Sequence, residues 1–298
     1  PPRKLAELLV AHLPASARVA KVEIAGPGFI NIFLTGDAIT AVVPDILKAG
    51  ESWGQDLSGS KGKVMVEFVS ANPTGPMHVG HGRGAAYGDT LANLFAATGY
   101  AVHREYYIND AGRQVDVLTV SVWLRYLEAS GLSFDFPKRC YPADYIKHTA
   151  ARVHAAHGAA SEQLQAVVFD GLGAEPRVPE GADDKTKDTI KLAQEKFADG
   201  LIERARALLG ESYAVITRIA LDDQLATIRA TLASFNVRFD QWYSERALVD
   251  SGFAGTAVQR LRDKGFTKIE AGAEWLKTTD FGDEKDRVLF KADGAATY

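Results

Sequence analysis

Two histidines three residues apart, His78 and His81, are the side chains whose type and spacing most clearly suggest chemistry. They lie in the stretch ANPTGPMHVGHGRG, residues 71–84, which also contains two prolines and four glycines. Neither a helix nor a strand tolerates that mixture in its interior, so we expect a loop that presents both imidazoles. Imidazoles in a loop can hydrogen-bond an anion, bind a metal ion or cap a helix.

The segments around this loop predict how it is held. KVMVEFVS, residues 63–70, is nearly all apolar, as expected of a parallel strand covered on both faces. HGRGAAYGDTLANLFAATG, residues 81–99, predicts a helix that begins near residue 80, and YAVHREYYIND, residues 100–110, predicts a second strand. One side of that helix carries Tyr87, Leu91, Leu94, Phe95 and Thr98, and Gly99 ends it. The result is a βαβ unit, so the fold class is α/β.

In such a fold the ligand lies outside the carboxyl ends of the strands, where a helix N-terminus faces an anion. Gly80, Gly82 and Gly84 would let a phosphate approach the backbone. A dinucleotide site is disfavoured because the glycines form G-x-G-x-G rather than G-x-G-x-x-G. A zinc site would need further cysteines or histidines. We therefore favour a nucleotide phosphate site over zinc and over simple helix capping.

Glu67 is the only charge in the apolar strand and lies near its carboxyl end. A buried carboxylate without a partner is unfavourable, and a guanidinium would be a fitting bidentate partner. That guanidinium could belong to a substrate; the alternative is a neighbouring arginine or backbone group of the protein.

Composition limits the function classes. The 298 residues are 46% hydrophobic and 24% charged, which is typical of a soluble globular protein of about two domains. The single cysteine, Cys140, excludes an internal disulfide framework, fits a reducing compartment and is expected to be an inert buried thiol. No signal-peptide pattern and no apolar run of about 18–20 residues is present. The net charge of −4 does not indicate a DNA-coating protein.

The N-terminal segment predicts a small module. Leu5, Leu8, Leu9 and Leu13 have helical spacing, and KVEIAGPGFINIFL (residues 21–34) predicts two strands joined by a Gly-Pro-Gly turn. A second helix is expected over residues 37–49. The polar joint GQDLSGSKGK, residues 54–63, places a boundary near residue 62.

The middle of the chain predicts helices and one hairpin. Residues 183–210 form an amphipathic helix with Ile190, Phe197, Leu201 and Leu208 on one stripe, after a loop over residues 171–184. Another helix is expected from about 222 to 235, and residues 266–280 predict a hairpin around Ala271-Gly272.

Pro76-Met77-His78-Val79-Gly80-His81 resembles the His-Ile-Gly-His signature of class I aminoacyl-tRNA synthetases. Residues 66–100 and REYYINDAGRQ, residues 104–114, narrow the resemblance to arginyl-tRNA synthetase. Residues 277–298 resemble a later catalytic segment of that family, and residues 21–34 resemble the end of its additional N-terminal domain. Three motifs in order make the resemblance specific, while residues 136–235 match weakly.

The resemblance implies a Rossmann-like fold and a reaction. ATP and L-arginine form arginyl-adenylate and pyrophosphate, and the arginyl group then passes to the terminal ribose of tRNA with release of AMP. Mg²⁺ accompanies the ATP, and the family generally needs bound tRNA before it forms the adenylate. No protein nucleophile is required, so catalysis is positioning and charge stabilisation.

The resemblance also implies roles for single residues. His78 and His81 hold ATP and its transition state, adenine lies on Gly80, and Gly82 belongs to the same nucleotide site. The α-amino and carboxylate groups of arginine are held by Ser70, Asn72 and His81. Glu67 faces the guanidinium, and Tyr298 lines that pocket.

Phe29 and Asn31 match positions that contact the D-loop of tRNA in some relatives; the alternative is a core aromatic and a turn amide. Asn109–Gly112 match a motif beside the catalytic pocket, with an Asx turn as the alternative.

The resemblance divides the chain into the end of an N-terminal domain (1–62), the first half of the catalytic domain (63–135), an insertion (136–275) and the start of the second half (276–298). The insertion could touch the acceptor stem of tRNA. The family continues past Tyr298 with a further arginine-reading Asp, a Lys-Met-Ser-Lys loop and an anticodon-binding domain. We therefore expect a fragment that lacks the extreme N-terminus and the C-terminal half and is inactive alone, from a monomeric cytoplasmic enzyme that binds neither DNA nor membranes.

Two other functions remain open from the sequence. One is another ATP-dependent nucleotidyltransferase of the same fold, against which Glu67, Asn72 and Tyr298 argue. The other is a non-catalytic synthetase-like module that binds tRNA or a protein, which would have no need of His78, Gly80 and His81.

Overall fold

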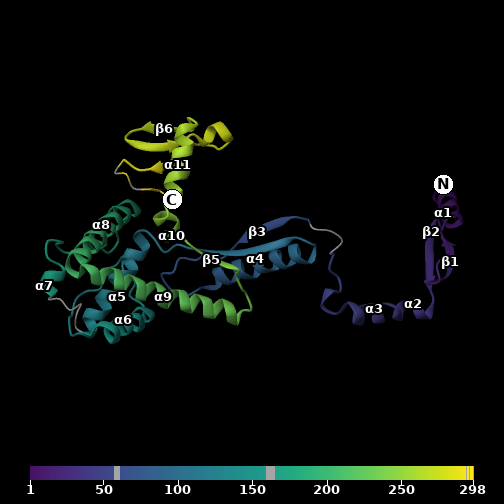
Figure 1. Cartoon of the computed structure of the whole chain (residues 1–298), viewed down its shortest axis with the longest axis horizontal. Coiled ribbons are helices and arrows are strands. Elements are labelled where there is room, and N and C mark those ends of the chain that lie inside the picture. Colours follow the sequence, from purple (N-terminus) through teal and green to yellow (C-terminus); the bar gives the residue numbers. More distant parts are fainter. Residues whose placement is uncertain (57–60, 159–164, 293, 295, 298) are drawn as a thin grey trace. The chain divides into compact units, whose positions relative to one another are not determined.

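The computed structural model describes residues 1–56, 61–158, 165–292, 294, 296 and 297. The chain divides into two compact units (Figure 1). The first contains Pro1–Gly62 and Phe95–Ala101, and the second contains Lys63–Leu94 and Val102–Tyr298.

The first unit contains the predicted hairpin. Strands β1 (Val19–Ala25) and β2 (Phe29–Leu34) pair antiparallel across Gly26-Pro27-Gly28. Gly28 has φ +143°, and a Cβ there would lie 2.8 Å from the backbone of Pro2, so only glycine lets helix α1 (Pro2–Ala11) approach this turn. The predicted first helix is confirmed, although Leu13 lies beyond its end.

The single helix predicted over residues 37–49 is instead two helices, α2 (Gly36–Thr40) and α3 (Val42–Ala49), followed by the 3₁₀ turn η1 (Gly50–Ser52). Pro44 explains the break. It has no N–H to donate, and its ring opposes the carbonyl of Thr40 four residues earlier, so it is tolerated only in the first turn of a new helix.

The second unit begins with a sheet in the order β3-β4-β5, made of Lys63–Glu67, Ala101–Ile108 and Gln241–Ser244. Strands β4 and β5 are parallel. Helix α4 (Val79–Ala97) connects β3 to β4 and runs along the strands (Figure 1). The predicted strand–loop–helix–strand unit is therefore confirmed.

The packing side of α4 differs from the prediction. Its buried residues are Ala85, Gly88 and Ala92, whereas Tyr87 and Leu94 are 73% and 59% exposed. A Cβ at Gly88 would lie 2.3 Å from the ring of Phe68. The helix meets the sheet through small residues because Phe68 fills the space between them, so Tyr87 and Leu94 turn outward, while Leu91 and Phe95 are half-buried.

Strand β3 is also not buried on both faces. Val66 and Phe68 are buried beneath α4, while Met65 and Glu67 alternate with them and are exposed. The prediction of a doubly covered strand was wrong for the described residues, because the face of β3 that carries Met65 and Glu67 stays exposed.

A helical bundle follows β4. Its helices are α5 (Arg113–Ala129), α6 (Asp144–His157), α7 (Gln165–Val168), α8 (Asp184–Leu209) and α9 (Glu211–Ser234). Helix α5 is the central one, in contact with α6, α8 and α9. Its Trp123, Leu124 and Leu127 are completely buried. Cys140 is buried beside them, and burial raises the pKa of its thiol to about 12, as expected of an inert thiol.

Two helix predictions need adjustment. Within the predicted stripe of α8, Leu201 is fully buried, but Ile190, Phe197 and Leu208 are only half-buried. Helix α9 begins at Glu211 rather than near residue 222. Gly210, with φ +52°, ends α8 and lets α9 start at the next residue, so no loop separates them.

The last segment contains α10 (Glu245–Asp250), α11 (Phe253–Asp263), the 3₁₀ turn η2 (Thr278–Phe281) and an antiparallel sheet β6-β7-β8. Its strands are Thr267–Glu270, Ala273–Leu276 and Arg287–Phe290. The predicted hairpin is confirmed at Ala271 (φ +50°) and Gly272 (φ +78°), as a type I′ turn requires. Across the part of the chain that the structure describes, every helix is too short or too polar to span a membrane.

Candidate functional site

The loop between β3 and α4 begins with an uncommon backbone conformation. Val69 has φ +66° and Ser70 has φ +40°, both in the left-handed region that non-glycine residues, and β-branched residues above all, rarely adopt. Such strain persists only where the surrounding contacts over-determine it.

Those contacts are hydrogen bonds from side chains to the backbone of the loop. Three carbonyl groups of the loop accept hydrogen bonds: Ser70 from Asn109 Nδ2 (3.2 Å), Ala71 from the Tyr106 hydroxyl (2.9 Å) and Thr74 from the Tyr145 hydroxyl (2.8 Å). Tyr106 is completely buried, and that burial raises the pKa of its hydroxyl to about 12. The path of the loop is thus fixed by β4, by the residue after it and by α6.

Gly75 explains how Tyr145 reaches the loop. A Cβ at Gly75 would lie 2.7 Å from the Tyr145 hydroxyl oxygen, so any side chain there would displace the tyrosine. This glycine serves a close approach by the protein itself, which the sequence pattern alone could not distinguish from an approach by phosphate.

The two histidines stack at the start of α4. Their ring centroids lie 3.7 Å apart with an interplanar angle of 20°. The Gly80 N–H donates to His78 Nδ1 (3.1 Å), and the His78 N–H donates to His81 Nδ1 (3.2 Å). A Cβ at Gly80 would lie 3.0 Å from the His78 ring, so a side chain there would disturb this stack.

These bonds determine the tautomers. A backbone N–H can only donate, so Nδ1 of each ring must accept and carry no proton. A neutral imidazole then carries its proton on Nε2, which becomes a donor. Burial, followed by the neighbouring His78, lowers the pKa of His81, so that ring is neutral near pH 7. Helix capping and ligand binding are therefore compatible. Capping uses Nδ1 of each ring and leaves an Nε2–H donor on each ring for a ligand.

Two cavities flank His78. One, of about 390 Å³, is lined by both histidines and by Asn72, Thr74, Gly75, Pro76, Tyr141 and Tyr145. The other, of about 190 Å³, lies between the start of α4 and the end of α9, where Met77, Gly82 and Phe235 are among its lining residues. Cβ atoms at Gly82 and Gly84 would meet nothing within 4 Å, so the space beside these glycines is open, as an approaching phosphate would require.

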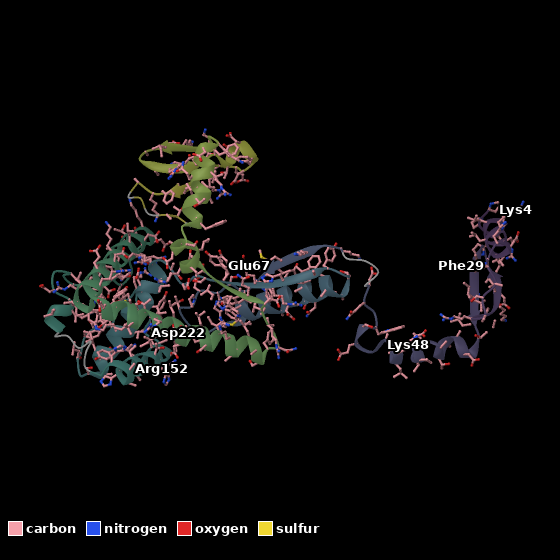
Figure 2. The ribbon with its side chains drawn as sticks, in the orientation of Figure 1. Lys4, Phe29, Lys48, Glu67, Arg152 and Asp222 are labelled. Carbon is pink, nitrogen blue, oxygen red and sulfur yellow. The ribbon has the colours of Figure 1, made fainter. Side chains whose placement is uncertain are left out.

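Glu67 lies at the end of β3 and is exposed, which corrects the expectation of a buried carboxylate (Figure 2). Its partner is a neighbouring hydroxyl rather than an arginine of the protein. Ser70 Oγ donates to Glu67 Oε1 (2.8 Å) and accepts from the Tyr107 N–H (3.1 Å). The strained turn therefore holds Ser70 between the carboxylate and strand β4.

The surroundings of Tyr107 are rich in negative charge. The Tyr107 ring stacks on Tyr243, with centroids 6.0 Å apart, and Tyr107 shares a hydrogen bond with the Glu245 side chain. Burial raises the pKa of the Tyr107 hydroxyl, and the carboxylates of Glu245, Asp110 and Glu67 raise it further. This side of the sheet suits a cationic group flanked by aromatic rings.

Asn72 is paired rather than free. Its Nδ2 donates to Oε1 of Gln114, the second residue of α5, at 2.6 Å. Both side chains are exposed.

The Asn109–Gly112 motif ties the two parallel strands together. The Asp110 carboxylate accepts hydrogen bonds from Ser244 Oγ (2.6 Å), at the last residue of β5, and from the Arg246 N–H (2.9 Å), in α10. Asp110 therefore joins the end of β4 to the end of β5 and the start of α10. Asn109 anchors the loop through its hydrogen bond to the Ser70 carbonyl.

The other predicted residues lie elsewhere. Phe29, labelled in Figure 2, lies on β2 in the first unit. Asn31 is on the same face of that strand, and both residues are exposed, Phe29 by 68%. The alternative of a core aromatic is thereby excluded for Phe29. Tyr298 lies outside the described residues.

Sequence reasoning missed Tyr141, Tyr145, Gln114 and Glu245. The two tyrosines line the larger cavity from a segment about 70 residues away in the sequence, and no pattern links them to the histidines. In the portion of the chain with described coordinates, no three His, Cys, Asp or Glu side chains gather in a way that could hold a metal ion.

The chain matches two sequence families. One is described as tRNA synthetases class I (R), catalytic domain, and matches residues 42–132. The other is the arginyl tRNA synthetase N terminal domain, which matches residues 1–34.

Curated relatives match the whole chain. An arginine–tRNA ligase of Thioalkalivibrio sulfidiphilus is 49% identical over 298 residues, which are 100% of this chain and 49% of that protein. One of Azoarcus sp. is 48% identical, again over 100% of this chain and 50% of the relative. The chain thus spans about half the length of the curated relatives it matches.

Among solved structures, a Campylobacter jejuni protein described as a candidate arginyl-tRNA synthetase superposes with a TM-score of 0.64 at 26% identity. The match covers 89% of this chain and 48% of that one. Thermus thermophilus arginyl-tRNA synthetase gives a TM-score of 0.51 over 100% of this chain and 43% of its own; at 24% identity it shows the fold alone. The predicted α/β class I synthetase fold is confirmed.

Proposed function

We propose, from the premise that this chain belongs to the arginyl-tRNA synthetase family, that it forms part of an arginine–tRNA ligase. That enzyme joins L-arginine to its tRNA in two steps, with ATP as the activating substrate. The observation that carries the proposal is the stacked His78–His81 pair, whose Nδ1 atoms accept backbone N–H groups at the start of α4.

The histidine pair would bind the phosphates of ATP. Each ring offers an Nε2–H donor, and the first backbone N–H groups of α4 add positive potential at the same end. Donors fixed before the reaction stabilise negative charge that develops in the transition state without reorganising. Gly82 and Gly84 leave room for the nucleotide beside this helix terminus.

In the first step the carboxylate of arginine attacks the α-phosphorus of ATP. The bond from that phosphorus to the bridging oxygen breaks, and pyrophosphate leaves. In the second step a terminal ribose hydroxyl of tRNA attacks the carbonyl carbon of the adenylate, and AMP leaves. Neither step needs a protein nucleophile, so the chain contributes positioning and charge stabilisation.

Arginine would lie along the end of β3. Glu67 would accept the guanidinium, with Tyr107 and Glu245 on the same side of the sheet supporting a cation. Ser70, Asn72 and His81 would hold the α-amino and carboxylate groups, and Tyr298 would complete the pocket. Because Glu67 is exposed and its partner in this structure is a hydroxyl, a substrate guanidinium can reach it.

Mg²⁺ would enter with the triphosphate, whose charge it offsets. A monomeric state, a cytoplasmic location and the absence of DNA and membrane binding stay predictions.

Phe29 and Asn31 would contact tRNA. Their exposure on one face of β2 supports this role, because an exposed phenylalanine is available to stack on a base. In the full-length protein, Asn31→Ala should raise the KM for tRNA and leave the KM for arginine unchanged. An unchanged tRNA dependence would remove this assignment.

The test of the overall proposal is ATP–pyrophosphate exchange on the full-length protein, with each amino acid in turn, with and without tRNA. We expect exchange with arginine and a strong dependence on tRNA. Exchange with another amino acid, or none with any under both conditions, would refute the proposal.

A further inference from the structure

We propose that Gln114 is a positioning residue that sets the orientation of the Asn72 side-chain amide in the arginine site. The inference rests on the proposed function, because it assigns Asn72 to the α-ammonium group of the substrate. Its basis is the 2.6 Å hydrogen bond from Asn72 Nδ2 to Gln114 Oε1.

The argument concerns which end of the amide faces the substrate. An asparagine side chain has one donor end, the NH₂ group, and one acceptor end, the carbonyl oxygen. An α-ammonium group only donates, so it needs the acceptor end. By taking the NH₂ group, Gln114 holds Asn72 with Oδ1 available for the ammonium. Without an acceptor at position 114, the amide would be free to turn its NH₂ group toward the positive charge.

The helix start that carries Gln114 is held in place. It is the second residue of α5, and the first residue, Arg113, is clamped to α8 through Asp199 (2.5 Å) and Glu195 (2.8 Å). Glu195 also pairs with Arg139 at 3.1 Å. The next residue along α5, Val115, is almost completely buried in the bundle core. The start of α5 is therefore anchored on both sides of Gln114.

Stability gives little reason for this hydrogen bond. Both side chains are exposed, where water competes for the same groups, so the bond adds little to the free energy of unfolding. An exposed but directional contact with a substrate-site residue, made from an anchored helix, is the arrangement expected of preorganisation.

The test exchanges the acceptor for a donor. In the full-length protein, Gln114→Lys removes the acceptor and offers only N–H donors, so Asn72 should turn its carbonyl toward position 114. We expect the KM for arginine in the exchange reaction to rise by about tenfold or more, the factor for one lost hydrogen bond with a charged group. The KM for ATP should stay unchanged. Gln114→Glu keeps an acceptor and should stay within about threefold of wild type.

A second substitution makes the test independent of general damage. Aspartate at position 72 has two equivalent acceptor oxygens, so its orientation does not matter. In the Asn72→Asp background, Gln114→Lys should therefore raise the arginine KM by less than about twofold, well below its effect in the wild-type background. A residue with only a structural role would show the same effect in both backgrounds.

Gln259→Lys is the matched control, since Gln259 is an exposed helical glutamine whose Nε2 bonds Asp263 on its own helix. It should leave both KM values unchanged, and urea unfolding should show that all variants are folded. Equal rises in the arginine and ATP KM values for Gln114→Lys, or no rise, would overturn the inference alone. A wild-type protein that fails to activate arginine would overturn the proposed function, and the inference with it.

Discussion

Helix α5 is ordered in a different way from residues 69–84, which form the loop after β3 together with the first turns of α4. Most side chains of α5 are buried among α6, α8 and α9, whereas few side chains of the loop are buried. The loop is held instead by hydrogen bonds to its carbonyl groups and by one glycine that admits Tyr145. Apolar burial specifies the bundle, and polar contacts to the backbone specify the loop.

This difference separates stability from activity. Burial is the main favourable term in folding, so the bundle should determine the free energy of unfolding. Side chains that stay exposed in a fixed loop are available to ligands, so the loop should determine the reaction. The predictions below would either sharpen that separation or break it.

The largest effect is expected in the bundle. Trp123 is completely buried in α5, so Trp123→Ala should lower the free energy of unfolding by about 3–5 kcal/mol through lost burial and a cavity. Urea unfolding of the full-length protein measures it. The fraction that remains folded should keep its KM values for arginine and ATP. A loss below about 1 kcal/mol would mean that the core is not centred on α5.

The converse effect is expected for the loop. His81→Ala removes one Nε2–H donor and should lower the rate of ATP–pyrophosphate exchange by about 100- to 1000-fold. The free energy of unfolding should fall by only about 1 kcal/mol, because the His78 N–H loses its acceptor. His12→Ala, at an exposed histidine of the first unit, is the control. An unchanged rate of ATP–pyrophosphate exchange in His81→Ala would refute the proposal that this loop binds ATP.

A smaller effect is expected at Glu67. Glu67→Gln keeps the shape but removes the charge, and should weaken arginine binding by about 10- to 100-fold, the range for a hydrogen bond to a charged group. Binding of ATP should hardly change. Calorimetric titrations of the full-length variant with each ligand measure both. Wild-type arginine affinity, or equal losses for the two ligands, would refute the role of Glu67.

The smallest effect is a pH dependence. Burial and the neighbouring His78 lower the pKa of His81 in the folded chain. At pH values between this lowered pKa and about 6.5, the usual pKa of histidine, the unfolded chain therefore binds more protons than the folded one. The stabilising contribution is therefore complete above about pH 6.5 and is lost as the pH falls through the folded pKa. His81→Gln should lose this part of the dependence when unfolding is measured from about pH 8 to pH 5. If the free energy of unfolding changed with pH in the same way for the variant and the wild type, the lowered pKa of His81 would be contradicted.

The sequence predicted the elements whose residues constrain the backbone locally. The Gly-Pro-Gly turn, the Ala271-Gly272 turn and the loop as far as His78 were identified correctly, because glycine and proline permit few alternatives there. The loop was expected to reach residue 84, whereas residues 79–84 already belong to α4. Pro44 could have shown the break in the helix predicted over residues 37–49, since its effect on the preceding turn is equally local.

Burial was harder to predict because it depends on which faces other elements cover. The apolar composition of residues 63–70 did not reveal that Met65 and Glu67 face away from α4. The side of α4 that packs was likewise decided by Phe68, a residue outside the helix. Tyr145 and Gln114 reach the site from 71 and 42 residues away along the chain, a separation that no local pattern encodes.

The two left-handed residues Val69 and Ser70 have a consequence for how this protein can be engineered and how it can evolve. Each such conformation costs on the order of 1–3 kcal/mol, so the turn is an obvious position at which a glycine would raise thermal stability. The same change would release Ser70 from its position between Glu67 and Tyr107. Selection for heat resistance alone should therefore favour substitutions that selection for turnover removes, and directed evolution should find its stabilising changes elsewhere, in the bundle.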